Sequence, residues 1–333
     1  PEENLWNNSF TPALYPLMRR LGFQKFIERW ALQPDEETEV VSLRMRYVNY
    51  TDGQPSSVVV YGYNEYGERT DLICYNSDGS LDHRTEWEFD ERGNKVLEGE
   101  FDEDNELKYW RQYEYSDENL ILSEMCYEPN GDLRYGTEYH YDEGLLYEEV
   151  SINVSNESAG AKAYFYNPDG TKRRTEYYDE NGNMKYFTEC EYDDAGRLTA
   201  EIQGNPDGEV YSCYEREYDA NGNEVRRAHY ETKELTLDYW VENVYDQAGV
   251  LLESTLYSND GSVNTHSVYT YDPYGNVRLT QEYDKDGNLK GWREHEREYD
   301  ADGNLLYDML QYKGQVSYED YYEPTRVLKH AAA

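Results

Sequence analysis

A repeat of about 26 residues in the position of turn residues is the feature that most constrains the fold of this 333-residue chain. One series of turn positions recurs every 25 to 28 residues, at Gly67, Gly93, Asn119, Gly144, Gly170, Gly196, Gly222, Gly249, Gly275 and Gly303. A second series lies between them, at Gly53, Gly79, Asn105, Gly131, Gly182, Gly208, Gly261, Gly287 and Gly314. Roughly ten copies of a unit with two turns therefore cover residues 41–316.

The segments between these turns have the length and composition of strands. They hold eight to ten residues rich in Tyr, Val, Thr, Leu and Arg. So short a step leaves no room for a crossover helix, which predicts antiparallel hairpins. Aromatic residues alternate with polar ones, as in Tyr113, Glu114 and Tyr115, so one face is aromatic and the other charged. We expect an all-β fold, an elongated or coiled antiparallel sheet of tandem 26-residue hairpins.

The repeated phrase has a mechanical interpretation, seen twice in YTYDPYGNVRLTQEYDKDGNL at residues 269–289. An Asp side chain accepts hydrogen bonds from the backbone of a tight turn, and Gly takes the left-handed conformation that other residues resist. We therefore predict structural turn roles for Asp219, Gly222, Asp272, Gly275, Asp284, Gly287, Asp300 and Gly303.

The two ends of the chain differ from the repeats. In residues 1–40, Thr11 and Pro12 indicate a helix start, and Leu14, Leu17 and Leu21 follow at helical spacing. We expect a short helical cap over the first sheet edge. Docking of these helices to a partner is the alternative. Residues 317–333 are predicted to be a C-terminal cap and tail, with YEDYYEP closing the other edge.

The charge of the chain limits its partners. Seventy Asp and Glu against 31 Lys and Arg give a net charge of −39. Nucleic acid and anionic membranes would repel such a surface. No apolar run approaches the ~20 residues of a helical span, so we also expect no membrane insertion. With 38 tyrosines and few aliphatic residues, the core is expected to be thin and made of Tyr faces.

The turn phrase resembles the YD repeats of bacterial Rhs and wall-associated proteins, which teneurins share. The matching strings are EYDANGNEV at 217–225, TYDPYGNV at 270–277, EYDKDGNL at 282–289 and EYDADGNL at 298–305. The resemblance covers most of residues 45–315 and implies a coiled antiparallel sheet that encloses cargo or presents a surface for adhesion or glycan contact. The period is longer than the family's. The chain also resembles MORN-like antitoxin repeats. This resemblance is weaker, because those repeats lack the YD pair.

No motif in the sequence predicts catalysis, a metal or a cofactor. Asp284, Asp286 and Asn288 echo the start of a calcium loop, but its twelfth position is His295 instead of Glu. Cys74, Cys126, Cys190 and Cys213 show no C-x-x-C spacing and are expected to be free thiols. The six histidines are scattered, without H-E-x-x-H or any nucleotide-binding motif. We therefore predict a protein that is not an enzyme and binds no metal or cofactor.

The remaining candidate site is the aromatic face. Its members are Trp87, Trp110, Trp240, Trp292, Tyr113 and Tyr269. Such rings stack on sugars, although rings in a chain with few aliphatic residues also serve as core. We expect a non-enzymatic, YD-repeat-like bacterial scaffold, secreted or at the cell surface, that binds a protein or glycan partner. A cytoplasmic antitoxin or immunity-type protein that neutralises a partner by binding is the alternative.

Overall fold

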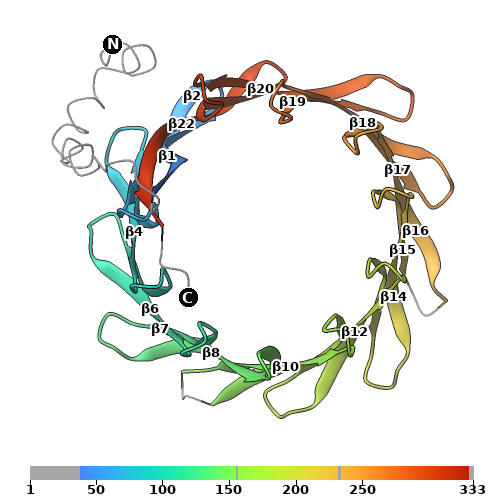
Figure 1. Ribbon diagram of the computed structural model, residues 1–333, viewed down its shortest axis with the longest axis horizontal. Coiled ribbons are helices and arrows are strands. Elements are labelled where there is room, and N and C mark those ends of the chain that lie inside the picture. The colour runs from blue at the N-terminus through green and yellow to red at the C-terminus, as the bar shows by residue number, and fades with distance from the viewer. Residues whose placement is uncertain (1–37, 155–156, 232–233, 330–333) are drawn as a thin grey trace. The chain divides into compact units, whose positions relative to one another are not determined.

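The described part of the chain is all-β. The structure, a computed structural model, describes residues 38–154, 157–231 and 234–329. Within these ranges there are 22 strands and no helix (Figure 1). The strands are β1 Thr38–Thr51, β2 Gln54–Tyr63, β3 Arg69–Asn76, β4 Leu81–Phe89, β5 Lys95–Phe101, β6 Leu107–Tyr115, β7 Ile121–Tyr127, β8 Leu133–Asp142, β9 Leu145–Ile152, β10 Ser158–Tyr166, β11 Lys172–Tyr178, β12 Met184–Tyr192, β13 Leu198–Gly204, β14 Val210–Tyr218, β15 Glu224–Glu231, β16 Thr236–Tyr245, β17 Leu251–Ser258, β18 Val263–Tyr271, β19 Val277–Tyr283, β20 Leu289–Tyr299, β21 Leu305–Tyr312 and β22 Gln315–Leu328.

The chain divides into two compact units. Unit 1 comprises residues 1–113, 128–130 and 295–333, and unit 2 comprises residues 114–127 and 131–294. In unit 1, strands β1 to β6 pair antiparallel with their chain neighbours, and β21 pairs with β22. In unit 2, the neighbouring strands from β7 to β20 pair in the same way.

The first and last strands of the series pair with each other in unit 1 (Figure 1). Strand β1 pairs antiparallel with β22 from Thr38 opposite Leu328 to Asn49 opposite Tyr318, while its other edge pairs with β2. The prediction of an elongated or coiled sheet with two edges to be covered is therefore wrong. The backbone of β1 pairs with the backbone of β22, so neither end of the strand series leaves an exposed strand edge there.

The prediction of an N-terminal helical cap fails for the same reason. Residues 38–40, placed in that cap, belong to β1. The YEDYYEP segment is part of β22, which pairs with β1. Residues 1–37 lie outside the described residues. Because β1 has strand partners on both sides, no edge is left for a helical cap to cover, and the expected association through N-terminal helices loses its basis.

The expectation that the chain does not insert into a membrane is also corrected. The lack of a long apolar run is a criterion for helical spans, whereas the regular elements among the described residues are strands. That argument therefore does not apply to this chain. Among the described residues, no helix is long and apolar enough to cross a membrane.

The YDxxGN phrase forms a hairpin turn with one geometry throughout. At Asp272, the main-chain carbonyl accepts the N–H of Gly275 at 3.1 Å, and the main-chain N–H donates to the Asn276 carbonyl at 2.8 Å. The carboxylate accepts the N–H groups of Tyr274 at 2.9 Å and Asn276 at 3.0 Å. Gly275 has φ of 87°. This is a type I turn followed by a left-handed residue, the usual three-residue hairpin loop.

The tyrosine that precedes the turn aspartate or asparagine bonds its strand to the strand before it. In six hairpins its hydroxyl donates to a main-chain carbonyl about twenty residues earlier in the chain. In unit 2, Tyr218 donates to Leu198 at 2.7 Å and Tyr271 to Leu251 at 2.5 Å. In five of these hairpins the phenol bonds at the start of the neighbouring strand, whereas Tyr63 bonds to Arg44 in the middle of β1. Sequence reasoning did not assign this role to the tyrosine.

Candidate functional site

Two of the predicted aromatic residues meet around one carboxylate in unit 1. Trp87 Nε1 donates to Glu98 Oε2 at 2.9 Å, and the Tyr113 hydroxyl lies 3.4 Å from the same oxygen. Lys95 and Arg111 form ion pairs with Glu98 as well. Burial raises the pKa of Glu98, but the hydrogen bonds from Lys95 and Trp87 outweigh it and hold that pKa below its usual value. Tyr113 is buried, so this cluster packs the sheet and offers little ring surface.

Trp110, a third predicted aromatic residue, does not share a face with these two. Glu98 pairs with both Trp87 and Arg111, so Trp110, next to Arg111 in β6, points to the opposite face.

Two predicted aromatic residues of unit 2 also lie on opposite faces of the sheet. Thr280 pairs with Tyr269 and with Arg293. Trp292, the neighbour of Arg293, therefore lies on the face opposite Tyr269. The six residues do not form a continuous platform.

Trp240 stands in a cross-strand stack. Its ring lies 4.8 Å from that of Tyr257 at an angle of 10°, and its Nε1 donates to Glu242 at 3.1 Å. Directly opposed aromatic pairs of this kind stabilise antiparallel sheets by ~1 kcal/mol. One face of this ring is thus occupied by its neighbour.

The predicted turn residues lie where the hairpins reverse direction. Gly222, Gly275, Gly287 and Gly303 have φ between 78° and 91°. In the candidate calcium loop, Asp284 Oδ1 accepts the N–H groups of Asp286 and Asn288, both at 2.9 Å. These backbone hydrogen bonds lower the pKa of Asp284. They engage the carboxylate inside the turn, as in turns without the second Asp such as that of Asp272.

An open groove of about 600 Å³ lies in unit 2, where the sequence offered no signal. It is bounded by the turn before β7 and by the β8–β9 hairpin. Its lining residues are Ser116, Glu118, Leu120, Leu122, Tyr139, His140, Tyr141, Gly144 and Tyr147. A volume of this size falls in the range of small-molecule sites, ~300–1,000 Å³.

The groove combines exposed apolar side chains with polar ring atoms. Leu122 and Tyr147 are 40% and 44% exposed. The rings of His140 and Tyr147 lie 6.1 Å apart and are tilted. Tyr147 is the extra residue of a β-bulge opposite His140, which turns its ring toward the histidine. Burial and nearby glutamates raise the pKa of Tyr139, so its hydroxyl remains a hydrogen-bond donor.

A buried histidine elsewhere in unit 2 has the partners of a hydrolase triad. Ser212 Oγ lies 3.2 Å from His229 Nε2, and His229 Nδ1 lies 3.1 Å from Asp238 Oδ2. The imidazole packs between Tyr214 and Tyr239, with ring centroids at 4.4 and 5.1 Å. Three strands supply these residues, so no sequence spacing could have found the arrangement.

The surroundings of that serine do not favour acyl transfer. An oxyanion hole needs backbone N–H groups that are free to bind a developing anion. Ser212 sits in β14, which is paired on both sides, with Gln203 opposite in β13 and Glu231 opposite in β15. Its stretch of backbone therefore serves the sheet ladder, and the trio is best understood as a satisfied buried polar group.

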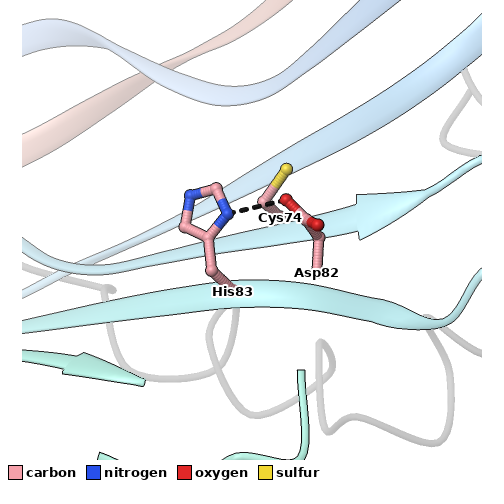
Figure 2. A group of neighbouring side chains, drawn as sticks. All are labelled: Cys74, Asp82 and His83. Atoms are coloured by element: carbon pink, nitrogen blue, oxygen red, sulfur yellow. Dashed lines mark hydrogen bonds and ion pairs between the residues drawn. The ribbon is translucent and has the colours of Figure 1, made fainter. Parts of the chain in front are cut away.

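A third cluster lies in unit 1, on the β3–β4 hairpin (Figure 2). Cys74, Asp82 and His83 place a sulfur, a carboxylate oxygen and a ring nitrogen within 4.8 Å of one another. His83 Nδ1 lies 2.8 Å from Asp82 Oδ2. Burial, with Asp82 nearby, raises the pKa of the Cys74 thiol to about 11. The sequence contains no C-x-x-C spacing, and a search for that pattern could not reveal a cluster formed across a hairpin.

Comparison with known proteins gives structural likenesses only. No protein-family model and no curated protein matches the sequence. Among solved structures, TcdB2-TccC3 without its hypervariable C-terminal region is 13% identical with a TM-score of 0.36, over 84% of this chain and 19% of that one. The chain thus spans about a fifth of that structure.

Two porin-like proteins are also similar. The one from Bacteroides uniformis is 12% identical with a TM-score of 0.27, over 86% of this chain and 97% of that one. The one from Bacteroides vulgatus is 9% identical with a TM-score of 0.26, over 85% and 98%. Likenesses at these TM-scores do not decide between functions, which are argued below from the residues of this chain.

Proposed function

We propose that this protein is a non-enzymatic binding protein that holds a neutral glycan in the groove of unit 2. The observation that carries the proposal is the groove of about 600 Å³ lined by Leu122, Tyr139, His140, Tyr141 and Tyr147. The six aromatic residues expected from the sequence are distributed over both faces of the sheet, so they support a glycan platform less well than the groove does.

The chemistry of the groove suits a sugar. Tyrosine and histidine rings offer flat apolar faces together with hydrogen-bonding groups, which match the apolar patches and hydroxyls of a carbohydrate. The net charge of −39 repels anionic ligands, which favours a neutral glycan. A volume of about 600 Å³ accepts a few sugar rings, whereas a stable protein partner would need ~800 Å² of contact surface.

The proposal that the protein is not an enzyme rests on the Ser212, His229 and Asp238 cluster. This is the arrangement among the described residues that most resembles a catalytic one, and its serine is paired with a strand on both sides. Replacing Ser212 with alanine should leave glycan binding unchanged, because Ser212 does not line the groove.

We further propose that the chain acts as a YD-repeat-like bacterial scaffold, secreted or at the cell surface. The turn phrases at 217–225, 270–277, 282–289 and 298–305 support this assignment. Fractionation of cells that express the full gene tests the location, and recovery of the protein only from the cytoplasm would overturn it.

An array of neutral glycans tests the binding proposal directly. The full chain should retain a defined group of neutral glycans on the array. Substitution of Tyr147 and Leu122 by alanine together should reduce retention by about tenfold or more, because both exposed side chains are removed from the groove.

The matched control is Tyr274→Ala. Tyr274 is 55% exposed and lies on a turn outside the groove, so its loss should leave retention unchanged. Equal loss in the control and in the groove variant, or no retention of any neutral glycan by the wild-type chain, would overturn the proposal.

A further inference from the structure

Three different metal-binding groups converge on the β3–β4 hairpin of unit 1 (Figure 2). Cys74 in β3 lies directly opposite His83 in β4, and a β-bulge follows between Cys74 and Tyr75. The extra residue of that bulge is Asp82, which brings its carboxylate beside the histidine and the thiol. The bulge thus allows two consecutive residues to face one cysteine.

The donor set and spacing suit zinc. Zinc binds thiolate, imidazole and carboxylate groups in tetrahedral geometry, with bond lengths of ~2.0–2.3 Å. Ligand atoms around one such ion lie ~3.3–3.8 Å apart, close to the present separations of at most 4.8 Å. The sulfur is fixed in a buried position, while the side chains of Asp82 and His83 are 50% and 37% exposed and can adjust.

The repeat itself does not require these residues. Three sister hairpins have the same register and the same bulge, but a lysine or arginine stands where Asp82 stands here. The residues that correspond to Cys74, Asp82 and His83 are Glu100, Lys108 and Tyr109 in β5–β6, Cys126, Arg134 and Tyr135 in β7–β8, and Tyr177, Lys185 and Tyr186 in β11–β12.

We propose that Cys74, Asp82 and His83 form a Zn²⁺ site. Three protein ligands leave the fourth tetrahedral position to water or another small ligand. The bound ion ties β3 to β4 at the bulge. Cys126 provides a natural comparison, because the same cysteine position beside Arg134 and Tyr135 lacks the other two ligands.

Cobalt titration of the full chain tests the site. Co²⁺ serves as a coloured probe for zinc, and about 0.15 M NaCl with excess Mg²⁺ suppresses diffuse cation binding to the acidic surface. One equivalent of Co²⁺ should produce visible bands of tetrahedral coordination and a near-ultraviolet sulfur-to-cobalt band, and Zn²⁺ should abolish both. Cys74→Ser should lose the sulfur band, and His83→Ala should weaken binding by about tenfold or more.

Cys126→Ser should behave as the wild-type chain. A sulfur-to-cobalt band that survives Cys74→Ser, or that is lost in Cys126→Ser, would overturn the proposal, as would the absence of the band in the wild-type chain.

Alkylation of the unmutated chain gives a readout that needs no variant. Zn²⁺ should slow iodoacetamide labelling of Cys74 while leaving that of half-buried Cys190 unchanged, and equal rates at Cys74 with and without Zn²⁺ would contradict the site.

Discussion

At the scale of single residues, each member of the YDxxGN phrase performs one task. Gly275 adopts φ of 87°, the Asp272 carboxylate binds two backbone N–H groups, and the Tyr271 hydroxyl bonds to the Leu251 carbonyl. A Cβ atom at Gly275 would meet no atom within 4 Å beyond its two chain neighbours, so only the backbone conformation selects glycine.

Gly275→Ala should therefore destabilise the protein by ~1–2 kcal/mol, the cost of a left-handed conformation in an ordinary residue. Gly275→Asn should cost less, because Asn119 holds φ of 69° in a sister turn. The midpoint of urea unfolding measures both effects. An alanine variant as stable as the wild-type chain would show that the turn does not impose this conformation.

Tyr218→Phe should cost ~1 kcal/mol, because it removes the hydrogen bond of 2.7 Å to the Leu198 carbonyl and leaves that carbonyl without this donor. The loss is limited because Phe89 occupies the same repeat position in β4 without a hydroxyl. Thermal unfolding measures the change, with Tyr274→Phe on an exposed turn as the control. Equal midpoints for the two variants would refute a stabilising role for this hydroxyl.

At the scale of elements, an ion pair between partly exposed Arg44 and buried Asp320 links β1 to β22. Arg44 donates two hydrogen bonds to Asp320, both at 2.5 Å, and Asp320 is only 2% exposed. Burial raises the pKa of Asp320 although the hydrogen bonds from Arg44 oppose this, and the bond to Asp320 raises the pKa of Arg44. These two residues join segments 276 positions apart.

Arg44→Ala should destabilise the protein by ~3 kcal/mol near neutral pH, because it leaves a buried carboxylate without its partner. Burial then raises the pKa of Asp320 further, so the folded state binds a proton more readily than the unfolded state. Stability lost in the variant should therefore be partly regained as the pH falls to about 5. Chemical unfolding of the variant and wild-type chain at both pH values measures this. A constant difference would contradict the assignment to Asp320.

The sequence predicted the hairpins well and the pairing of the ends poorly. Turn positions are local, because Asp272 and Gly275 determine their own conformation, so spacing alone located the strands. The partner of β1 is β22, and no local signal links Arg44 to Asp320. The groove and the Cys74 cluster were missed for a related reason, since their residues meet only after neighbouring strands pair and bulges redirect side chains such as Tyr147 and Asp82.

At the scale of the whole molecule, the net charge of −39 opposes folding through mutual repulsion of carboxylates. The turn aspartates act in the opposite direction. Hydrogen bonds from the side chain and backbone of Asn223 lower the pKa of Asp219, and those from Asn304 lower the pKa of Asp300. Their ionised forms therefore favour the folded state above the unfolded pKa, and this contribution is lost as the pH falls through the folded pKa.

Thermal stability should consequently pass through a maximum in mild acid. Between neutral pH and the isoelectric point near 4.3, repulsion declines and the melting temperature should rise. Below the unfolded aspartate pKa of 3.8, the turn carboxylates take up protons and stability should fall. Added NaCl should raise the melting temperature most at neutral pH. Calorimetric scans across pH test this, and a melting temperature that falls steadily from neutral pH would contradict the charge argument.

The central functional claim is that the groove beside β7, β8 and β9 binds a neutral glycan. Calorimetric titration of the full chain with the neutral glycan best retained on an array tests it most directly. We predict saturable heat with one site per chain, an affinity about tenfold weaker for Tyr147→Ala, and an unchanged affinity for Tyr274→Ala. Binding by Tyr147→Ala that equals the wild-type chain, or no saturable heat at all, would contradict the claim.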